Sequence, residues 1–84
     1  MRAIQVFSRR GCHLCEVLIE ELMPVVRDVC RVEVLDVDSR PEWREAYGKR
    51  VPVVEFDGDF VCQYYLDRDA IMARLARAAP EDDE

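Results

Sequence analysis

Two cysteines separated by two residues are the part of this sequence best suited to chemistry. The run from Cys12 to Cys15 reads Cys-His-Leu-Cys, a spacing that permits a tight disulfide. At a helix start, unpaired N–H groups and the positive end of the helix dipole stabilise a thiolate, and such thiols have pKa values lowered to roughly 3.5 to 7.5. The motif lies between residues 2–8, which predict a strand, and a helical pattern that begins at Leu14. We therefore expect Cys12 at the N-terminus of that helix, as the nucleophile, and Cys15 one turn further in.

Charged side chains near the pair affect the same thiolate. Arg9, Arg10 and a protonated His13 would favour the anion, whereas Glu16 in the first turn would oppose it. We expect a net lowering of the Cys12 pKa. His13 itself is expected to face solvent rather than to act as a general base.

The cysteine pair is also compatible with two roles that involve no disulfide exchange. Both cysteines could be small buried hydrophobes. They could also bind zinc or an iron-sulfur cluster shared between two chains, with His13, Cys30 and Cys62 as the further candidate ligands. The sequence contains no second C-x-x-C motif, and Glu16 stands where haem attachment would need histidine. We expect Cys30 and Cys62 to be buried and unpaired.

The first half of the chain predicts a strand, a helix and a second strand. Residues 2–8 are nearly continuously apolar, as in a central strand, and apolar residues between 14 and 29 recur at helical spacing. Pro24 favours a kink or an early stop of this helix at Met23. Residues 31–38 predict the second strand. Such a β-α-β unit makes the two strands parallel through a right-handed crossover.

A short helix is predicted next. Residues 39–42 read Ser-Arg-Pro-Glu, which resembles a capping box with proline in the first turn. Trp43, Ala46 and Tyr47 would share one face of this helix. We expect the two aromatic side chains to make core contacts rather than to form a binding platform.

The chain then predicts a hairpin and a last helix. Residues 51–56 and 60–65 are β-rich, and the Asp57-Gly58 pair between them is a strong hairpin signal. Asp67 can cap the last helix. The buried face of that helix would carry Ile71, Leu75 and Ala78.

The predicted order is β-α-β-α-β-β-α, an α/β fold with a four-stranded mixed sheet and helices on both faces. We expect the strands in the spatial order two-one-three-four. A length of 84 residues fits one domain. We assign residues 1–79 to this domain and residues 80–84 to a disordered acidic tail.

Composition excludes several classes of function. The chain has 12 basic and 18 acidic residues and a net charge of −6, so it lacks the basic surplus that binds nucleic acid. Apolar runs such as residues 23–26 are far shorter than the roughly 20 residues of a membrane helix. The first residues lack the apolar run, roughly 7 to 15 residues long, of a secretory signal. We therefore expect a cytoplasmic protein that binds neither nucleic acid nor a membrane.

A second motif accompanies the cysteine pair. Arg50-Val51-Pro52 stands before the third predicted strand, about forty residues after Cys12-His13-Leu14-Cys15. With these motifs and this order of elements over roughly residues 2–78, the chain resembles the thioredoxin-like superfamily and, within it, the small glutaredoxin-like proteins. The resemblance implies a thioredoxin-like (glutaredoxin-like) fold.

The resemblance also implies a thiol-disulfide oxidoreductase. Cys12 would attack a substrate disulfide, and Cys15 would resolve the mixed disulfide. In the family the proline is cis and faces the sulfurs, and the residue before it pairs with the substrate through its backbone, which gives these roles to Pro52 and Val51. A monomer without a bound cofactor is implied, with glutathione as a candidate reductant and protein or small-thiol disulfides as substrates. The alternative is a non-enzymatic module that shares a metal or an iron-sulfur cluster through the C-x-x-C.

Arg10, His13 and Arg50 are further candidates for substrate contacts. If Arg9 gathers around the sulfurs with Arg10 and Arg50, anionic disulfides should react faster than neutral ones. Two family features differ here: the Pro-Tyr between the cysteines is replaced, and residues 62–67 lack the Gly-Gly that lets glutathione approach closely. We therefore expect weak glutathione binding.

Overall fold

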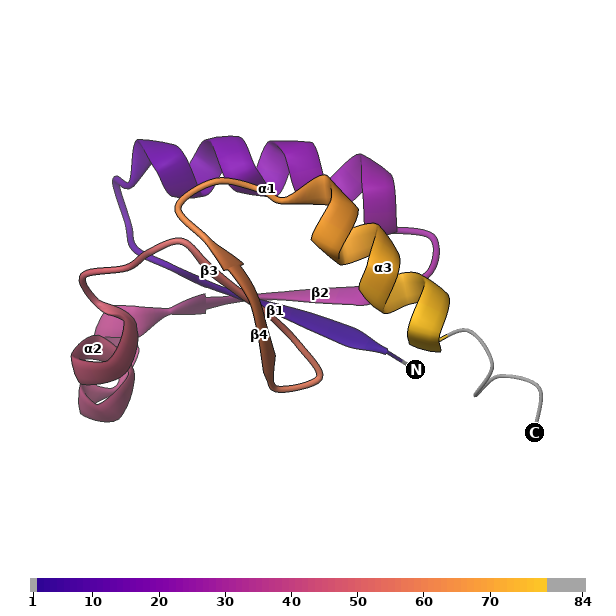
Figure 1. Cartoon of the computed structure of the whole chain (residues 1–84). Coiled ribbons are helices and arrows are strands. Elements are labelled where there is room, and N and C mark those ends of the chain that lie inside the picture. The colour runs from indigo at the N-terminus through magenta and orange to yellow at the C-terminus, as the bar shows by residue number, and fades with distance from the viewer. Residues whose placement is uncertain (1, 79–84) are drawn as a thin grey trace.

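The computed structural model describes residues 2–78, which form a four-stranded sheet with helices on both faces (Figure 1). The elements are β1 (Ala3–Ser8), α1 (His13–Val26), β2 (Arg31–Asp36), the 3-10 helix η1 (Val37–Ser39), α2 (Pro41–Tyr47), β3 (Val53–Phe56), β4 (Asp59–Gln63) and α3 (Arg68–Ala78). Apart from the added η1, this order confirms the predicted fold. The tail predicted at residues 80–84 lies outside the described residues.

The sheet has the predicted strand order, β2-β1-β3-β4. β1 pairs in parallel with β2 and antiparallel with β3, and β3 pairs antiparallel with β4. Because β1 and β2 are parallel, the chain must cross back over the sheet between them, and α1 makes this crossover. The turn from β1 into α1 carries the cysteine pair.

The main core lies between the sheet and the pair α1 and α3, which cover the same face (Figure 1). Alternate residues of a strand face the same side, so β1 contributes every second side chain to this core. Its central members are at most 1% exposed: Ile4, Val6, Leu18, Leu22, Val26 and Ile71. Within the described part of the chain, neither α1 nor any other helix is long and apolar enough to cross a membrane.

Helix α1 continues past Pro24 and ends at Val26, so the predicted early stop at Met23 is wrong. Proline removes the hydrogen bond of its own N–H and crowds the carbonyl one turn earlier, but it leaves the later N–H groups able to bond. The end of the helix keeps its other bonds, from Arg27 N–H to the Met23 carbonyl at 2.9 Å and from Cys30 N–H to the Val26 carbonyl at 2.8 Å. Burial of Val26 in the core holds this last turn in place.

Helix α2 covers the other face of the sheet through two aromatic side chains. Tyr47 stacks on Phe7 of β1 with ring centroids 4.1 Å apart, and Trp43 lies edge-on to the same ring at 5.4 Å. Both therefore make the core contacts predicted for them. Ala46, predicted on the same face, is exposed, and the contacts to Phe7 come from the side chains at 43 and 47.

The start of α2 differs from the predicted capping box. The N-cap is Arg40, and no side chain caps the helix, although Pro41 does stand in its first turn. The Ser39 hydroxyl instead donates to the Asp36 carbonyl at 2.6 Å, and the Asp36 carboxylate accepts from the Asp38 N–H at 2.9 Å. These local bonds turn the chain into η1, so β2 ends two residues before its predicted end.

The hairpin and the cap of α3 are confirmed. Asp57 and Gly58 have φ angles of 52° and 91°, and positive φ at both central residues defines the type I′ hairpin turn. The Asp67 carboxylate accepts from the Ala70 N–H at 3.0 Å. β4 ends at Gln63 rather than at residue 65, because Tyr64 has a φ of 69°, which does not fit an extended strand.

Candidate active site

Cys12 and Cys15 form a disulfide at the start of α1, with their Cα atoms 5.2 Å apart. Cys12 is the N-cap residue, and its Sγ accepts a hydrogen bond from the Cys15 N–H at 3.2 Å. Cys15 is 1% exposed, whereas Cys12 is only partly buried. The positions predicted for the two sulfurs are confirmed. An incoming molecule can therefore reach Cys12 more readily than Cys15.

A tight turn places Cys12 at the helix start. The Cys12 N–H donates to the Arg9 carbonyl at 3.1 Å, which closes a turn over Arg10 and Gly11. Gly11 has a φ of 79°, the value that the third residue of a type II turn requires and that glycine adopts without strain. The backbone of residues 9–12 thus fixes where the Cys12 sulfur lies.

The neighbouring side chains leave this turn open to solvent. Arg10, His13 and Glu16 are all exposed, as predicted for His13. A surface cavity of about 390 Å³ lies beside the turn and extends to β2. Its lining consists of Ser8, Arg9, Arg10, Gly11, Glu16, Val34 and Asp36.

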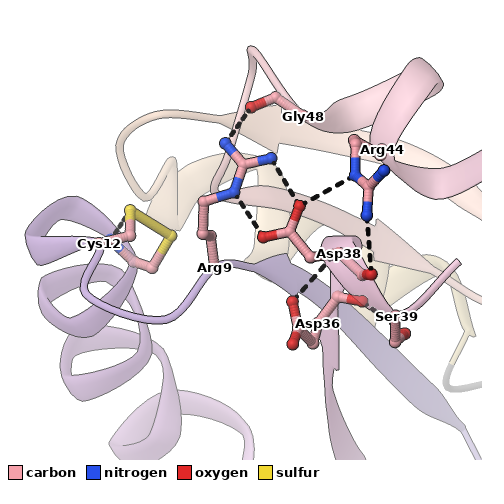
Figure 2. Close-up of polar contacts among 8 residues, drawn as sticks. Arg9, Cys12, Asp36, Asp38, Ser39, Arg44 and Gly48 are labelled. Carbon is pink, nitrogen blue, oxygen red and sulfur yellow. Dashed lines mark hydrogen bonds and ion pairs between the residues drawn. A yellow bond between two sulfur atoms is a disulfide. The ribbon is translucent and has the colours of Figure 1, made fainter. Parts of the chain in front are cut away.

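The Arg9 guanidinium is engaged by other groups. It donates to both carboxylate oxygens of Asp38, at 2.9 and 3.1 Å, and to the Gly48 carbonyl at 2.9 Å (Figure 2). The hydrogen bond from Arg9 holds the pKa of Asp38 below its usual value. The Arg9 guanidinium is thus directed toward Asp38 and Gly48, and the Asp38 carboxylate offsets part of its positive charge.

Sequence reasoning did not identify Asp38 or its second partner, Arg44. Arg44 Nε donates to Asp38 Oδ1 at 3.2 Å, and the Arg44 guanidinium also donates to the Asp38 carbonyl at 3.2 Å. The parallel register could have provided a signal, because it pairs Ser8 with Asp36 and so brings the residues that follow both strands to one sheet edge.

The second motif lies where β3 begins. The peptide bond between Val51 and Pro52 is cis, and the Pro52 carbonyl accepts from the Tyr64 N–H at 2.8 Å. Among the described residues, Val51 makes no backbone hydrogen bond outside the strand and helix ladders, and β3 starts two residues later. The Val51 backbone therefore remains available to a further partner.

Arg50 is held against the protein rather than extended. Its guanidinium donates to Gln63 Oε1 at 3.0 Å and to the Ala46 carbonyl at 3.3 Å. It also lies over the Tyr47 ring, 5.5 Å from the centroid. These contacts hold the Arg50 guanidinium beside α2 and β4.

The remaining cysteines are buried and free, as predicted. Cys30 and Cys62 are 5% and 7% exposed and belong to the main core. Burial raises the pKa of both thiols. Within residues 2–78, the structure brings together no group of three or more His, Cys, Asp or Glu side chains that could hold a metal ion.

The chain matches a known protein family. Residues 3–76 match the family model described as "Glutaredoxin-like domain (DUF836)". No curated protein sequence matches the chain at a significant level.

Solved structures share the fold. The structural genomics target XcR50 from X. campestris is 26% identical, with a TM-score of 0.68 over 89% of this chain and 97% of that protein. A buckwheat glutaredoxin in complex with glutathione is 19% identical, with a TM-score of 0.53 over 94% and 74% of the two chains. The holo form of glutaredoxin C1 from Populus tremula x tremuloides is 18% identical, with a TM-score of 0.50 over 89% and 75%. The last two similarities concern the fold alone.

Proposed function

Because this chain belongs to the glutaredoxin-like domain family, we propose that it is a thiol-disulfide oxidoreductase acting on protein or low-molecular-weight disulfides. The observation that carries the proposal is the Cys12–Cys15 disulfide at the start of α1. There one sulfur is partly accessible and accepts a backbone hydrogen bond, and the other is buried one turn away. This asymmetry suits one attacking thiol and one resolving thiol.

The reaction proceeds in two exchanges. In the reduced protein, the Cys12 thiolate attacks one sulfur of the substrate disulfide, whose S–S bond breaks and releases a first thiolate that takes up a proton. Cys15 then loses its proton and attacks Cys12 Sγ, and the second substrate thiolate leaves and is protonated. The substrate gains two electrons and two protons, and the protein ends as the Cys12–Cys15 disulfide.

An external thiol must return the protein to its reduced form. Two molecules of glutathione supply the two electrons and become glutathione disulfide. All the electrons pass between sulfur atoms, so the reaction needs no bound cofactor. We also propose that the protein acts as a monomer in the cytoplasm.

The backbone of Val51 is proposed to hold the substrate chain beside the sulfurs. Two observations support this role. Val51 lies before β3, and within the described residues its backbone makes no loop hydrogen bond. The next residue, Pro52, is buried. A substrate segment in extended form could pair with this backbone as an added strand does. Such pairing depends little on substrate side chains.

Arg10, His13 and Arg50 are the proposed side-chain contacts to the substrate. Arg10 lies in the turn before Cys12, His13 is the first residue of α1, and both are exposed. Arg50 directly precedes Val51, and its hydrogen bond to Gln63 fixes its position. Arg10 and Arg50 can donate charge-assisted hydrogen bonds to an anionic thiol compound such as glutathione, and the His13 ring can donate a further hydrogen bond.

Stoichiometric reduction tests the proposal. Pre-reduced protein, freed of reductant, is mixed with a neutral fluorogenic disulfide peptide, and released thiols are counted while the protein is mapped by mass spectrometry. We expect two thiols for each Cys12–Cys15 disulfide formed, loss of the reaction in Cys12→Ser, and full activity in the control Cys30→Ala. Metal analysis and absorption spectra of anaerobically purified protein complete the test. A coloured, iron-containing protein that reduces no disulfide would instead support the metal-sharing module.

A further inference from the structure

One guanidinium joins the two segments that form the proposed site. Arg9 Nε and Nη2 donate to the two carboxylate oxygens of Asp38, and Arg9 Nη1 donates to the Gly48 carbonyl (Figure 2). The paired bonds to Asp38 form a planar, two-point contact, which fixes orientation as well as position. The Arg9 side chain therefore has little freedom to move.

The backbone of Arg9 is hydrogen-bonded to that of the proposed nucleophile, Cys12. Its carbonyl oxygen accepts the Cys12 N–H at 3.1 Å and closes the turn in which Gly11 has positive φ. Because side chain and carbonyl belong to the same residue, holding the guanidinium restrains the carbonyl as well. The position of Cys12 is thereby tied to the position of Asp38.

The side chain of Arg9 is hydrogen-bonded to the segment before Pro52, through the Gly48 carbonyl. Gly48 ends α2 and stands three residues before Val51. A Cβ atom at residue 48 would clash with the Arg44 carbonyl oxygen of α2 and would also lie 3.2 Å from Nη2 of Arg9, so a larger residue would crowd both the end of α2 and the guanidinium. The next residues are also held, because Arg50 N–H donates to the Tyr47 carbonyl at 2.8 Å and the Tyr64 hydroxyl donates to the Lys49 carbonyl at 3.3 Å.

Asp38 is itself anchored from two directions. Its N–H donates to the Asp36 carboxylate at the end of β2, and its carboxylate and carbonyl accept from Arg44 of α2. The ion pair is exposed to solvent, so its contribution to the free energy of unfolding is small. Its contribution to geometry can be large, since a misplacement of about 1 Å can lower a reaction rate by roughly 100-fold.

We propose that Arg9 is a positioning residue that, held by Asp38, sets the placement of Cys12 relative to the Val51 backbone. This inference rests on the proposed function, because it concerns a substrate that must reach both groups. It predicts that only substrates long enough to contact Val51 depend on Arg9. If Arg9 acted only through its positive charge, Arg9→Lys would retain activity. Removal of the Asp38 charge would then increase the rate with anionic substrates.

The test compares two neutral substrates in three variants. One substrate is a disulfide-containing peptide long enough to pair with Val51, and the other is bis(2-hydroxyethyl) disulfide, which can reach only the sulfur. In Arg9→Lys and in Asp38→Asn, we expect kcat/KM for the peptide to fall about fivefold or more. In the double variant, kcat/KM for the peptide should fall no further than in the less active of the two single variants, because both changes break the same contact. The rate with the small disulfide should change less than about twofold.

The ratio of the two rates makes the test independent of folding, because partial unfolding would lower both rates by the same factor. Arg31→Lys serves as the matched control, since Arg31 forms a similarly exposed ion pair with Glu33 at 3.2 Å at the far end of β2; its ratio should equal that of the wild type. An unchanged ratio in Arg9→Lys, or additive losses in the double variant, would overturn the inference while leaving the proposed function intact. A wild-type protein that reduces neither substrate would instead refute the proposed function.

Discussion

The backbone N–H of Cys15 donates a hydrogen bond to Sγ of Cys12 at 3.2 Å. The donor belongs to the first turn of α1, where N–H groups have no partner within the helix. In the reduced protein the same N–H group can stabilise a thiolate at Cys12, and the helix dipole acts in the same direction. Cys15 instead lies inside the first turn of α1, and the residue is only 1% exposed. The two sulfurs therefore differ in both charge stabilisation and access.

Alkylation rates should reflect this difference. We expect iodoacetamide at mildly acidic pH to modify Cys12 of the reduced protein well before Cys15, because the thiolate is the reactive form. Peptide mapping by mass spectrometry at successive times gives both rates. Equal rates at the two sulfurs would contradict the assignment of Cys12 as the nucleophile.

Cys30 and Cys62 should stay unmodified under the same conditions. Burial limits access to both thiols and raises their pKa, so less thiolate is present at neutral pH. Labelling after unfolding in urea should reach all four cysteines and serves as the control. A Cys30–Cys62 disulfide in a peptide map of the oxidised monomer would contradict their places in the core.

Short-range signals predicted the helix start that carries the cysteine pair and several other local features of the fold. The helix start at Cys12, the turn at Asp57-Gly58 and the cap at Asp67 each depend on neighbouring residues. Their physical causes are the dipole and free N–H groups, positive φ, and a side-chain oxygen within reach of the first turn. Such causes are visible in a single stretch of sequence.

Features that depend on competition or distance could not be predicted in this way. Ser39 could have capped α2, but its hydroxyl donates to the Asp36 carbonyl, and residue type alone does not decide between the two bonds. The sequence also predicted Arg9 only as a cation that would favour the Cys12 thiolate. Its partner Asp38 lies 29 residues away, and only the parallel pairing of β1 with β2 brings the two together.

Truncation of Phe7 should destabilise the α2 side of the sheet. Phe7 is 4% exposed and contacts both Tyr47 and Trp43, so Phe7→Ala should cost about 3 to 5 kcal/mol of unfolding free energy. Urea denaturation measures this change. Phe60→Ala is the control, because Phe60 is 54% exposed, and it should change stability by no more than about 0.5 kcal/mol. Equal effects of the two substitutions would contradict the described packing.

The Arg9–Asp38 pair should give stability a small pH dependence of defined sign, because the pair is exposed to solvent. The hydrogen bond from Arg9 lowers the pKa of Asp38 in the folded protein, whereas an unfolded aspartate titrates near about 3.9. The stabilisation is therefore fully present above about pH 4 to 5 and is lost as the pH falls through the lower, folded pKa. Urea denaturation at several pH values should show a constant difference between wild type and Asp38→Asn at neutral pH and a shrinking one in acid. A difference that grows in acid would show that Asp38 is not held as an anion by Arg9.

Capture of the mixed disulfide tests the central claim most directly. Reduced Cys15→Ser, freed of reductant, is mixed with a disulfide peptide and measured by intact mass and peptide mapping without reduction. We predict one half of the peptide bound to Cys12, its release by dithiothreitol, and no such adduct in Cys12→Ser. Absence of the adduct in Cys15→Ser, or its attachment to Cys30 or Cys62, would contradict the proposal that Cys12 is the attacking sulfur of a thiol-disulfide oxidoreductase.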